Sequence, residues 1–116
     1  AGLTPSATAP APSKRILNTI TYERSTMPDT AELRAQIETI DEEIIDLIAT
    51  RMEISDELAK AKKKAGVGYW DDEKEREVVH RYMELCEEVS LSEDEAKQIA
   101  EVILHISKER QKHFFE

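Results

Sequence analysis

The sequence predicts an all-α protein made of one long and two medium helices. Apolar residues recur at helical spacing from residue 33 onward, and capping signals divide the chain into three segments. Aromatic residues are only 5% of the chain and charged residues are 35%. A core must therefore come from narrow stripes of Leu, Ile, Val and Ala, which are buried more easily between several helices or between two chains.

The first 28 residues differ in composition from the rest of the chain. They hold all four prolines and are rich in Ser, Thr and Ala, so they can bury little apolar surface. We interpret residues 1–28 as a flexible tail or linker and residues 29–116 as one helical domain.

The long helix is predicted to begin at Asp29 or Thr30, either of which can cap it. It is predicted to end at Lys62–Ala65, because cations suit a helix C-terminus and Gly66 can adopt the left-handed cap. Its apolar row is Leu33, Ile37, Ile40, Ile44, Leu47, Ile48 and Leu58. A helix of about 35 residues is about 50 Å long, more than one small domain can cover, so the sequence favours an intertwined homodimer.

The two medium helices follow from local signals. One is predicted to begin near Asp71 and to end before Leu91. The other is predicted to open at Ser92, because the S-x-x-E pattern with Glu95 is a capping box.

Composition also excludes several classes of function. Cys86 is the only cysteine and the three histidines lack a metal-ligand spacing, so we expect no disulfide framework and no metal. The formal charge of −9 disfavours nucleic acid as a partner. No window is long and apolar enough to span a bilayer, and one cysteine fits a reducing, cytoplasmic location.

Several polar residues border the apolar rows. Arg51 and Lys62 are 11 residues apart and share a helical face, whereas Arg34 is about 25 Å from Arg51 along the same helix. Arg34 could therefore serve only a partner's site of the same kind. Two further groups stand beside the rows of the medium helices: Asp71, Lys74 and Glu75, and Ser107 with Gln111. From spacing alone, such residues are more often solvated or weakly paired surface side chains than members of a functional site.

In order and spacing, these residues resemble the all-helical chorismate mutases of the type II family. The resemblance rests on Leu33-Arg34-x-x-Ile37-x-x-Ile40-Asp41, Arg51, Lys62, Asp71 with Glu75, and Ser107-x-x-x-Gln111, and it covers residues 33 to about 111. It implies a homodimeric enzyme that rearranges chorismate to prephenate in aromatic amino-acid biosynthesis and needs no cofactor.

The resemblance also implies a role for each residue. Arg51, and Arg34 from the other subunit, would clamp the carboxylates of the substrate, and Lys62 and Gln111 would donate to its ether oxygen. Asp71 and Glu75 would contact the ring hydroxyl or nearby backbone, and Ser107 would line the carboxylate side.

Lys74 departs from the family pattern, which usually has Arg at this position. An ammonium cannot form the planar two-bond fork that a guanidinium makes with a carboxylate. Two alternatives on the same fold therefore stay open: an isochorismate pyruvate lyase and a mutase for an amino analogue of chorismate. A non-catalytic helical dimerisation or regulatory module is the alternative of another class, although dimerisation alone needs neither Arg34 nor Lys62.

Overall fold

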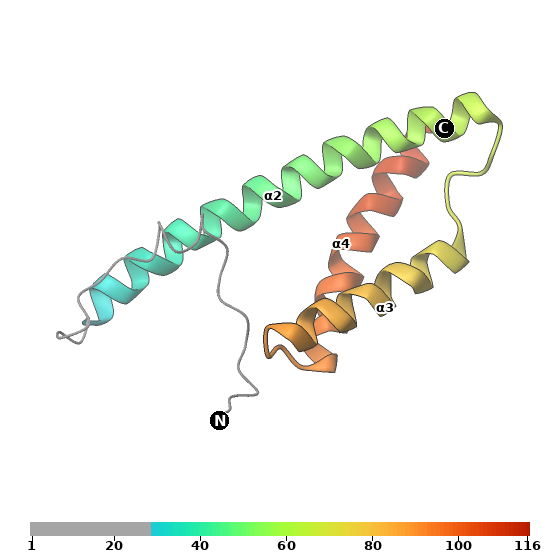
Figure 1. Ribbon diagram of the computed structural model, residues 1–116. Helices are drawn as coiled ribbons and strands as arrows, with labels where there is room; N and C mark the ends of the chain where they lie inside the picture. The colour runs from blue at the N-terminus through green and yellow to red at the C-terminus, as the bar shows by residue number, and fades with distance from the viewer. Residues whose placement is uncertain (1–28) are drawn as a thin grey trace. The chain divides into compact units, whose positions relative to one another are not determined.

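The computed structural model describes residues 29–116, which form three α-helices joined by two short links (Figure 1). The helices are α2 (Thr30–Ala65), α3 (Asp72–Glu88) and α4 (Glu93–Phe114). The predicted all-α class and the order of one long and two medium helices are confirmed. The tail expected at residues 1–28 lies outside the described residues.

Both ends of α2 are closed by the residues that the sequence indicated. At the start, the Asp29 carboxylate accepts the backbone N–H of Glu32 at 2.9 Å. At the end, Gly66 has a φ of 75°, and the N–H groups of Gly66 and Val67 donate to the carbonyls of Lys63 and Lys62. This pair of bonds is a Schellman motif, and it needs a residue that tolerates the left-handed region.

The two shorter helices begin at polar caps. The Asp71 carboxylate accepts the backbone N–H groups of Glu73 and Lys74 at the start of α3. Ser92 and Glu95 form the predicted capping box at the start of α4, with bonds of 2.8 and 3.1 Å. The backbone N–H of Ser92 lowers the pKa of the Glu95 carboxyl by stabilising its ionised form.

The buried residues of residues 50–116 are mostly small. The buried residues of α2 follow one another at about one helical turn, and α3 contributes Cys86. α4 packs against α3 and contributes the longest row of buried residues. Small side chains let the helices approach closely, and three of the buried residues are polar. These buried residues are Met52, Ser55, Ala59, Cys86, Ala96, Ala100, Ile103, Leu104, Ser107 and Gln111.

Polar bonds also join the C-terminal parts of α2 and α4. The Arg110 guanidinium donates two hydrogen bonds to the Asp56 carboxylate, at 3.0 and 2.6 Å, and lowers the pKa of that carboxyl. Lys63 Nζ donates to the carbonyl of Phe114 at 3.1 Å. Because the bonded positions advance together along both helices, these parts of α2 and α4 run in the same sense.

Residues 30–49 of α2 differ from the rest of the helix, because none of their side chains is buried. Several large apolar side chains in this stretch are strongly exposed, with Ile37 at 56% and Leu47 at 57%. The exposed apolar residues here are Leu33, Ile37, Ile44, Ile45 and Leu47. The described part of the chain alone therefore leaves this apolar row in contact with water.

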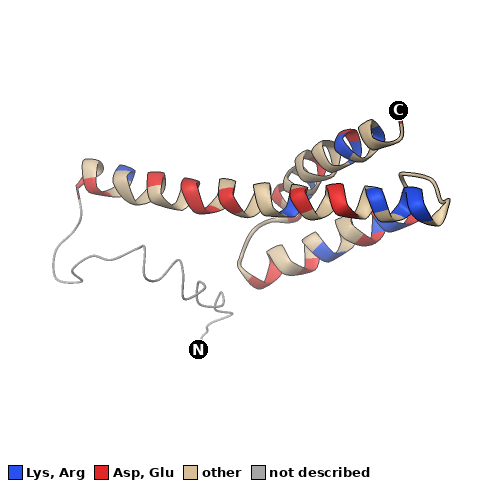
Figure 2. Cartoon of the chain, turned by 90° about the horizontal axis from the view of Figure 1, so that it is seen from above, with Lys and Arg blue, Asp and Glu red and all other residues tan. Residues whose placement is uncertain are grey.

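Charge is unevenly distributed along the helices. Lys and Arg gather at the C-terminal end of α2, where Lys62, Lys63 and Lys64 occupy the last turn (Figure 2). The first turns of α3 and α4 each carry three acidic residues. Both arrangements complement the helix dipoles. Within residues 29–116, no helix has the length and apolar character required to cross a membrane.

Candidate active site

A pocket of about 280 Å³ lies among the three helices within residues 50–116. Its apolar wall consists of Ile54, Leu58, Trp70, Val78 and Leu104. This volume is close to the lower end of the range of about 300 to 1,000 Å³ found for small-molecule pockets, so the pocket suits a small ligand.

The polar lining of the pocket includes six of the eight residues that the sequence indicated. They are Arg51, Asp71, Lys74, Glu75, Ser107 and Gln111. These residues come from α2, from the end of the link between α2 and α3, from α3 and from α4. Arg51 is half-buried, and within residues 29–116 it forms no ion pair, so its guanidinium is available to an anion.

Lys62 adjoins the pocket through Gln111. Its Nζ donates to Gln111 Oε1 at 2.7 Å and to the carbonyl of Tyr69 at 2.9 Å. The Nζ also lies 5.8 Å from the centre of the Trp70 ring, within the range of a cation–π contact. Burial lowers the pKa of Lys62 from 10.5, and the charge of Asp71 partly opposes that shift. A partly desolvated ammonium interacts with anions more strongly than a surface lysine does.

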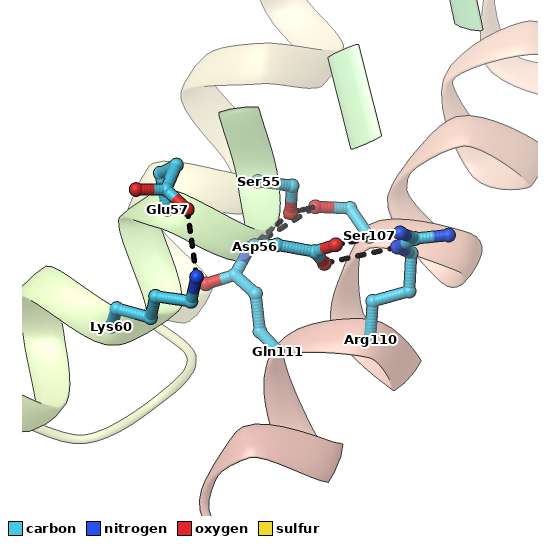
Figure 3. A network of polar contacts seen from close by, with 7 residues as sticks. All are labelled: Ser55, Asp56, Glu57, Lys60, Ser107, Arg110 and Gln111. Carbon is cyan, nitrogen blue, oxygen red and sulfur yellow. Dashed lines mark hydrogen bonds and ion pairs between the residues drawn. The ribbon is translucent and has the colours of Figure 1, made fainter. Parts of the chain in front are cut away.

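A buried polar network of three pocket-lining residues, Ser55, Ser107 and Gln111, joins α2 and α4 (Figure 3). Ser55 Oγ and Ser107 Oγ are 2.6 Å apart and share one hydrogen bond. Gln111 Nε2 donates to both hydroxyls, at 3.0 Å to Ser55 and 3.1 Å to Ser107. All three residues are at most 5% exposed. The network therefore holds the Gln111 amide firmly in one orientation.

The acidic residues beside α3 have structural partners of their own. Asp71 caps the helix, as described above, and Trp70 Nε1 donates to Glu75 Oε1 at 2.9 Å. Lys74 is mostly exposed and pairs weakly with Glu77 at 3.4 Å. Lys74 is therefore the polar lining residue with the greatest freedom to move toward a ligand.

Arg34 is not among the residues that line the pocket. It lies on residues 30–49 of α2 and is exposed. Its expected contribution to the site of a second subunit stays a prediction.

The residues at the pocket that the sequence did not indicate include Ser55 and Trp70. Ser55 stands one helical turn after Arg51, so this spacing could have identified it. For Trp70, no signal in the sequence pointed to its bond with Glu75.

Within residues 29–116, no group of three or more His, Cys, Asp or Glu side chains is arranged to hold a metal ion. The pocket instead combines an apolar wall with two cations, two carboxylates and hydroxyl and amide side chains. An apolar wall with a few placed polar groups is typical of a helical protein that binds a small molecule in a defined orientation.

Comparison with known proteins agrees with this class. Residues 33–112 match the chorismate mutase type II family, and the chain belongs to that family. The chain is 31% identical over 86 residues to a protein named "Chorismate mutase" from Methanocaldococcus jannaschii, an alignment that covers 74% of this chain and 87% of that protein. No solved structure matches the chain. The chain is thus an enzyme of the isomerase class that rearranges chorismate to prephenate.

Proposed function

We propose that the pocket among α2, α3 and α4 is the site where chorismate becomes prephenate. The observation that supports this proposal most is the meeting of Arg51, Lys74 and Gln111 on one small apolar cavity, with Lys62 bonded to Gln111. These residues come from three helices and from positions up to 60 residues apart in the chain.

The reaction needs no nucleophile, acid or base. In one concerted step, the ether C–O bond of chorismate breaks while a C–C bond forms, and no atom is gained or lost. The protein must fold the flexible dianion into its reactive conformer and must favour the transition state over the ground state. Arg51 supports the first task, because its guanidinium has no ion-pair partner among residues 29–116 and can bind a carboxylate with two parallel hydrogen bonds.

Lys62 supports the second task. As the ether bond breaks, negative charge develops on the ether oxygen, and a fixed donor at that place stabilises the transition state selectively. An ammonium has three donor hydrogens, and Lys62 directs two of them to Gln111 and Tyr69. Within residues 29–116 the third has no acceptor, so it can serve the ether oxygen.

The remaining lining residues set the shape and charge of the pocket. Glu75, held by Trp70, and Asp71 would contact the ring hydroxyl of the substrate or nearby backbone. Ser107 would line the carboxylate side. Lys74 would reach a carboxylate as a single point donor, because its present partner Glu77 holds it only weakly.

The proposed enzyme is a homodimer in which Arg34 serves the site of its partner. The exposed apolar row of residues 30–49 supports this proposal, because a second copy would remove that surface from water. The position of Arg34 beside Leu33 on this row would bring the guanidinium into the interface.

Turnover measurements test the proposed reaction. Purified protein is given chorismate and, separately, isochorismate, and the products are identified, with Arg51→Ala as the control for contaminating enzymes. Prephenate formation that is lost in the variant supports the proposed site. If the variant still forms prephenate, Arg51 is not part of the active site. If the protein forms only pyruvate, from isochorismate, its activity is that of a lyase.

Mixing two inactive variants tests the shared site. Arg34→Ala and Lys62→Ala chains are each expected to be nearly inactive, but a mixed dimer holds one intact site when Arg34 acts across subunits. Random exchange gives half mixed dimers, so about a quarter of the wild-type activity should return. No recovery after verified subunit exchange would place Arg34 outside the partner's site.

A further inference from the structure

The only tryptophan of the chain contacts two other residues of the proposed site. Trp70 Nε1 donates to Glu75 Oε1 at 2.9 Å, and both side chains line the pocket. The centre of the indole ring lies 5.8 Å from Lys62 Nζ and 5.5 Å from Lys108 Nζ. Both distances are within the range of a cation–π contact. One hydrogen bond and two cations therefore fix the orientation of the indole.

The start of α3 brings Trp70 and Glu75 together. Trp70 directly precedes Asp71, which caps the helix, and the backbone N–H of Glu75 donates to the Asp71 carbonyl at 3.0 Å. Because side chains on a helix lean toward its N-terminus, the Glu75 carboxylate reaches back to the indole. A contact across the start of a helix also fixes the entry of the chain, but an aromatic ring without a donor could do the same. The indole N–H adds a defined direction for the carboxylate.

The hydrogen bond from Trp70 distinguishes the two oxygens of Glu75. Oε1 accepts from the indole, whereas within residues 29–116 no hydrogen bond or ion pair engages Oε2. Glu75 is half-buried and lines the pocket, so Oε2 is accessible to a ligand there. An ionised carboxylate only accepts hydrogen bonds, and it therefore suits a hydroxyl hydrogen. The pocket cations Arg51 and Lys74 carry only donors and cannot take this part.

We propose that Trp70 is a positioning residue for the ring hydroxyl of the substrate. Its indole N–H holds Glu75 Oε1, so that Oε2 is directed into the pocket and accepts from that hydroxyl. The inference rests on the proposed function and deepens it, since it assigns a role to Trp70 and separate roles to the two oxygens of Glu75.

The substitution Trp70→Phe tests the N–H, because it keeps an aromatic face for the two lysines. The KM for chorismate should rise about fivefold while kcat changes less than about twofold. The ring hydroxyl gains no charge in the reaction, so its contact is equally strong in the ground state and the transition state. An unchanged KM would overturn the proposal. A fall in kcat without a rise in KM would also overturn it, since Trp70 would then act on Lys62.

A substrate without the ring hydroxyl separates positioning from general damage to the pocket. The chorismate analogue that lacks this hydroxyl retains the bonds that break and form in the rearrangement. Its KM should differ less than about twofold between wild type and Trp70→Phe, because the group that Glu75 would contact is missing. An equal rise in KM for both substrates would show that the indole does not act through the hydroxyl, and the proposal would be wrong.

A spectroscopic readout tests the contact without turnover. Trp70 is the only tryptophan, so the full chain labelled with nitrogen-15 gives one indole N–H resonance. A hydrogen bond to a carboxylate moves this proton downfield, so Glu75→Ala should move it upfield and speed its exchange with water about tenfold. Glu73→Ala removes an exposed carboxylate from the same turn and should change neither.

The outcomes distinguish this inference from the proposed function. If wild type converts chorismate but Glu75→Ala leaves the indole resonance and its exchange unchanged, the inference fails and the proposed function stands. If wild type converts no chorismate, both fail, because the ring hydroxyl belongs to that substrate.

Discussion

The two halves of α2 have different environments although they belong to one continuous helix. Residues 50–65 contribute buried positions, line the pocket and exchange hydrogen bonds with α4. Residues 30–49 have no buried side chain and expose Leu and Ile. The same helical periodicity thus produces a packed half and an uncovered half.

Helix formation and burial therefore have separate causes in α2. Local signals such as caps and propensity form both halves of the helix. Burial depends on a partner, and the described chain supplies one only for residues 50–65.

The apolar row of residues 30–49 can be tested by placing a charge on it. Ile37→Glu should weaken dimerisation about a thousandfold or more, because each of two symmetry-related carboxylates would be buried without a partner. Sedimentation at several concentrations measures this change. Ala35→Glu is the matched control, since it adds the same charge on an exposed position off the row. Equal dimerisation of wild type and Ile37→Glu would show that this row is not the interface.

Removing the ammonium tests the packed half. Lys62→Ala should lower kcat a hundredfold or more, an effect of about 3 kcal/mol, because the developing charge loses its donor. The protein should stay helical by circular dichroism. Lys64→Ala, in the same helical turn but exposed, should keep its activity. Substantial activity in a folded Lys62→Ala protein would remove Lys62 from the proposed role.

The pH dependence gives a finer test of the same residue. Burial lowers the pKa of Lys62, so its ammonium should lose its charge at a lower pH than an ordinary lysine, whose pKa is 10.5. Above that lowered pKa, the rate should fall about tenfold per pH unit. Any activity that Lys62→Arg retains should persist to higher pH, because a guanidinium stays charged. If the rate fell at the same alkaline pH in both proteins, the titrating group would be a residue other than Lys62.

The same shift has a consequence for stability with the opposite sign. In the window between the lowered pKa and 10.5, the unfolded chain binds more protons at this position than the folded chain. The contribution of Lys62 to the free energy of unfolding therefore rises with pH across this window, while the activity falls. Denaturant titrations of wild type and Lys62→Met, compared across this window, measure that contribution.

The smallest expected effect lies at the end of the packed half. Gly66→Ala should lower the free energy of unfolding by about 1 kcal/mol, because alanine is strained at a φ of 75° although no atom lies within 4 Å of the added Cβ. Gly68→Ala meets equally open space without a left-handed φ and should lower it by less. Equal effects of the two substitutions would mean that the cap geometry is not the cause.

The helices could be predicted because their boundaries are local. Each capping residue acts within about one turn of its own position. The helices begin at Asp29, Asp71 and Ser92, and α2 ends at Gly66, as the sequence indicated. The grouping of six expected residues at one pocket followed from their spacing together with the family resemblance.

The direction of the hydrogen bonds could not be predicted. Lys62 determines which atom of the Gln111 amide accepts, and Ser55 and Ser107 face the nitrogen that donates. These neighbours come from two helices. A single serine within a helix gives no sign of the helix it will face. The bond between Trp70 and Glu75 is similar, because indole N–H groups find partners that only the folded chain brings near.

The link between α2 and α3 has a consequence for how this enzyme can change over generations. Surface loops usually accept inserted residues at little cost. Residues 66–71 are instead closed at both ends by helix caps. They supply Trp70 and Asp71 to the pocket and the Tyr69 carbonyl to Lys62. A single inserted residue would displace a wall of the pocket, so changes of loop length here should alter the size of molecule accepted before they alter the fold. Libraries that seek new substrates can begin with the length of this segment.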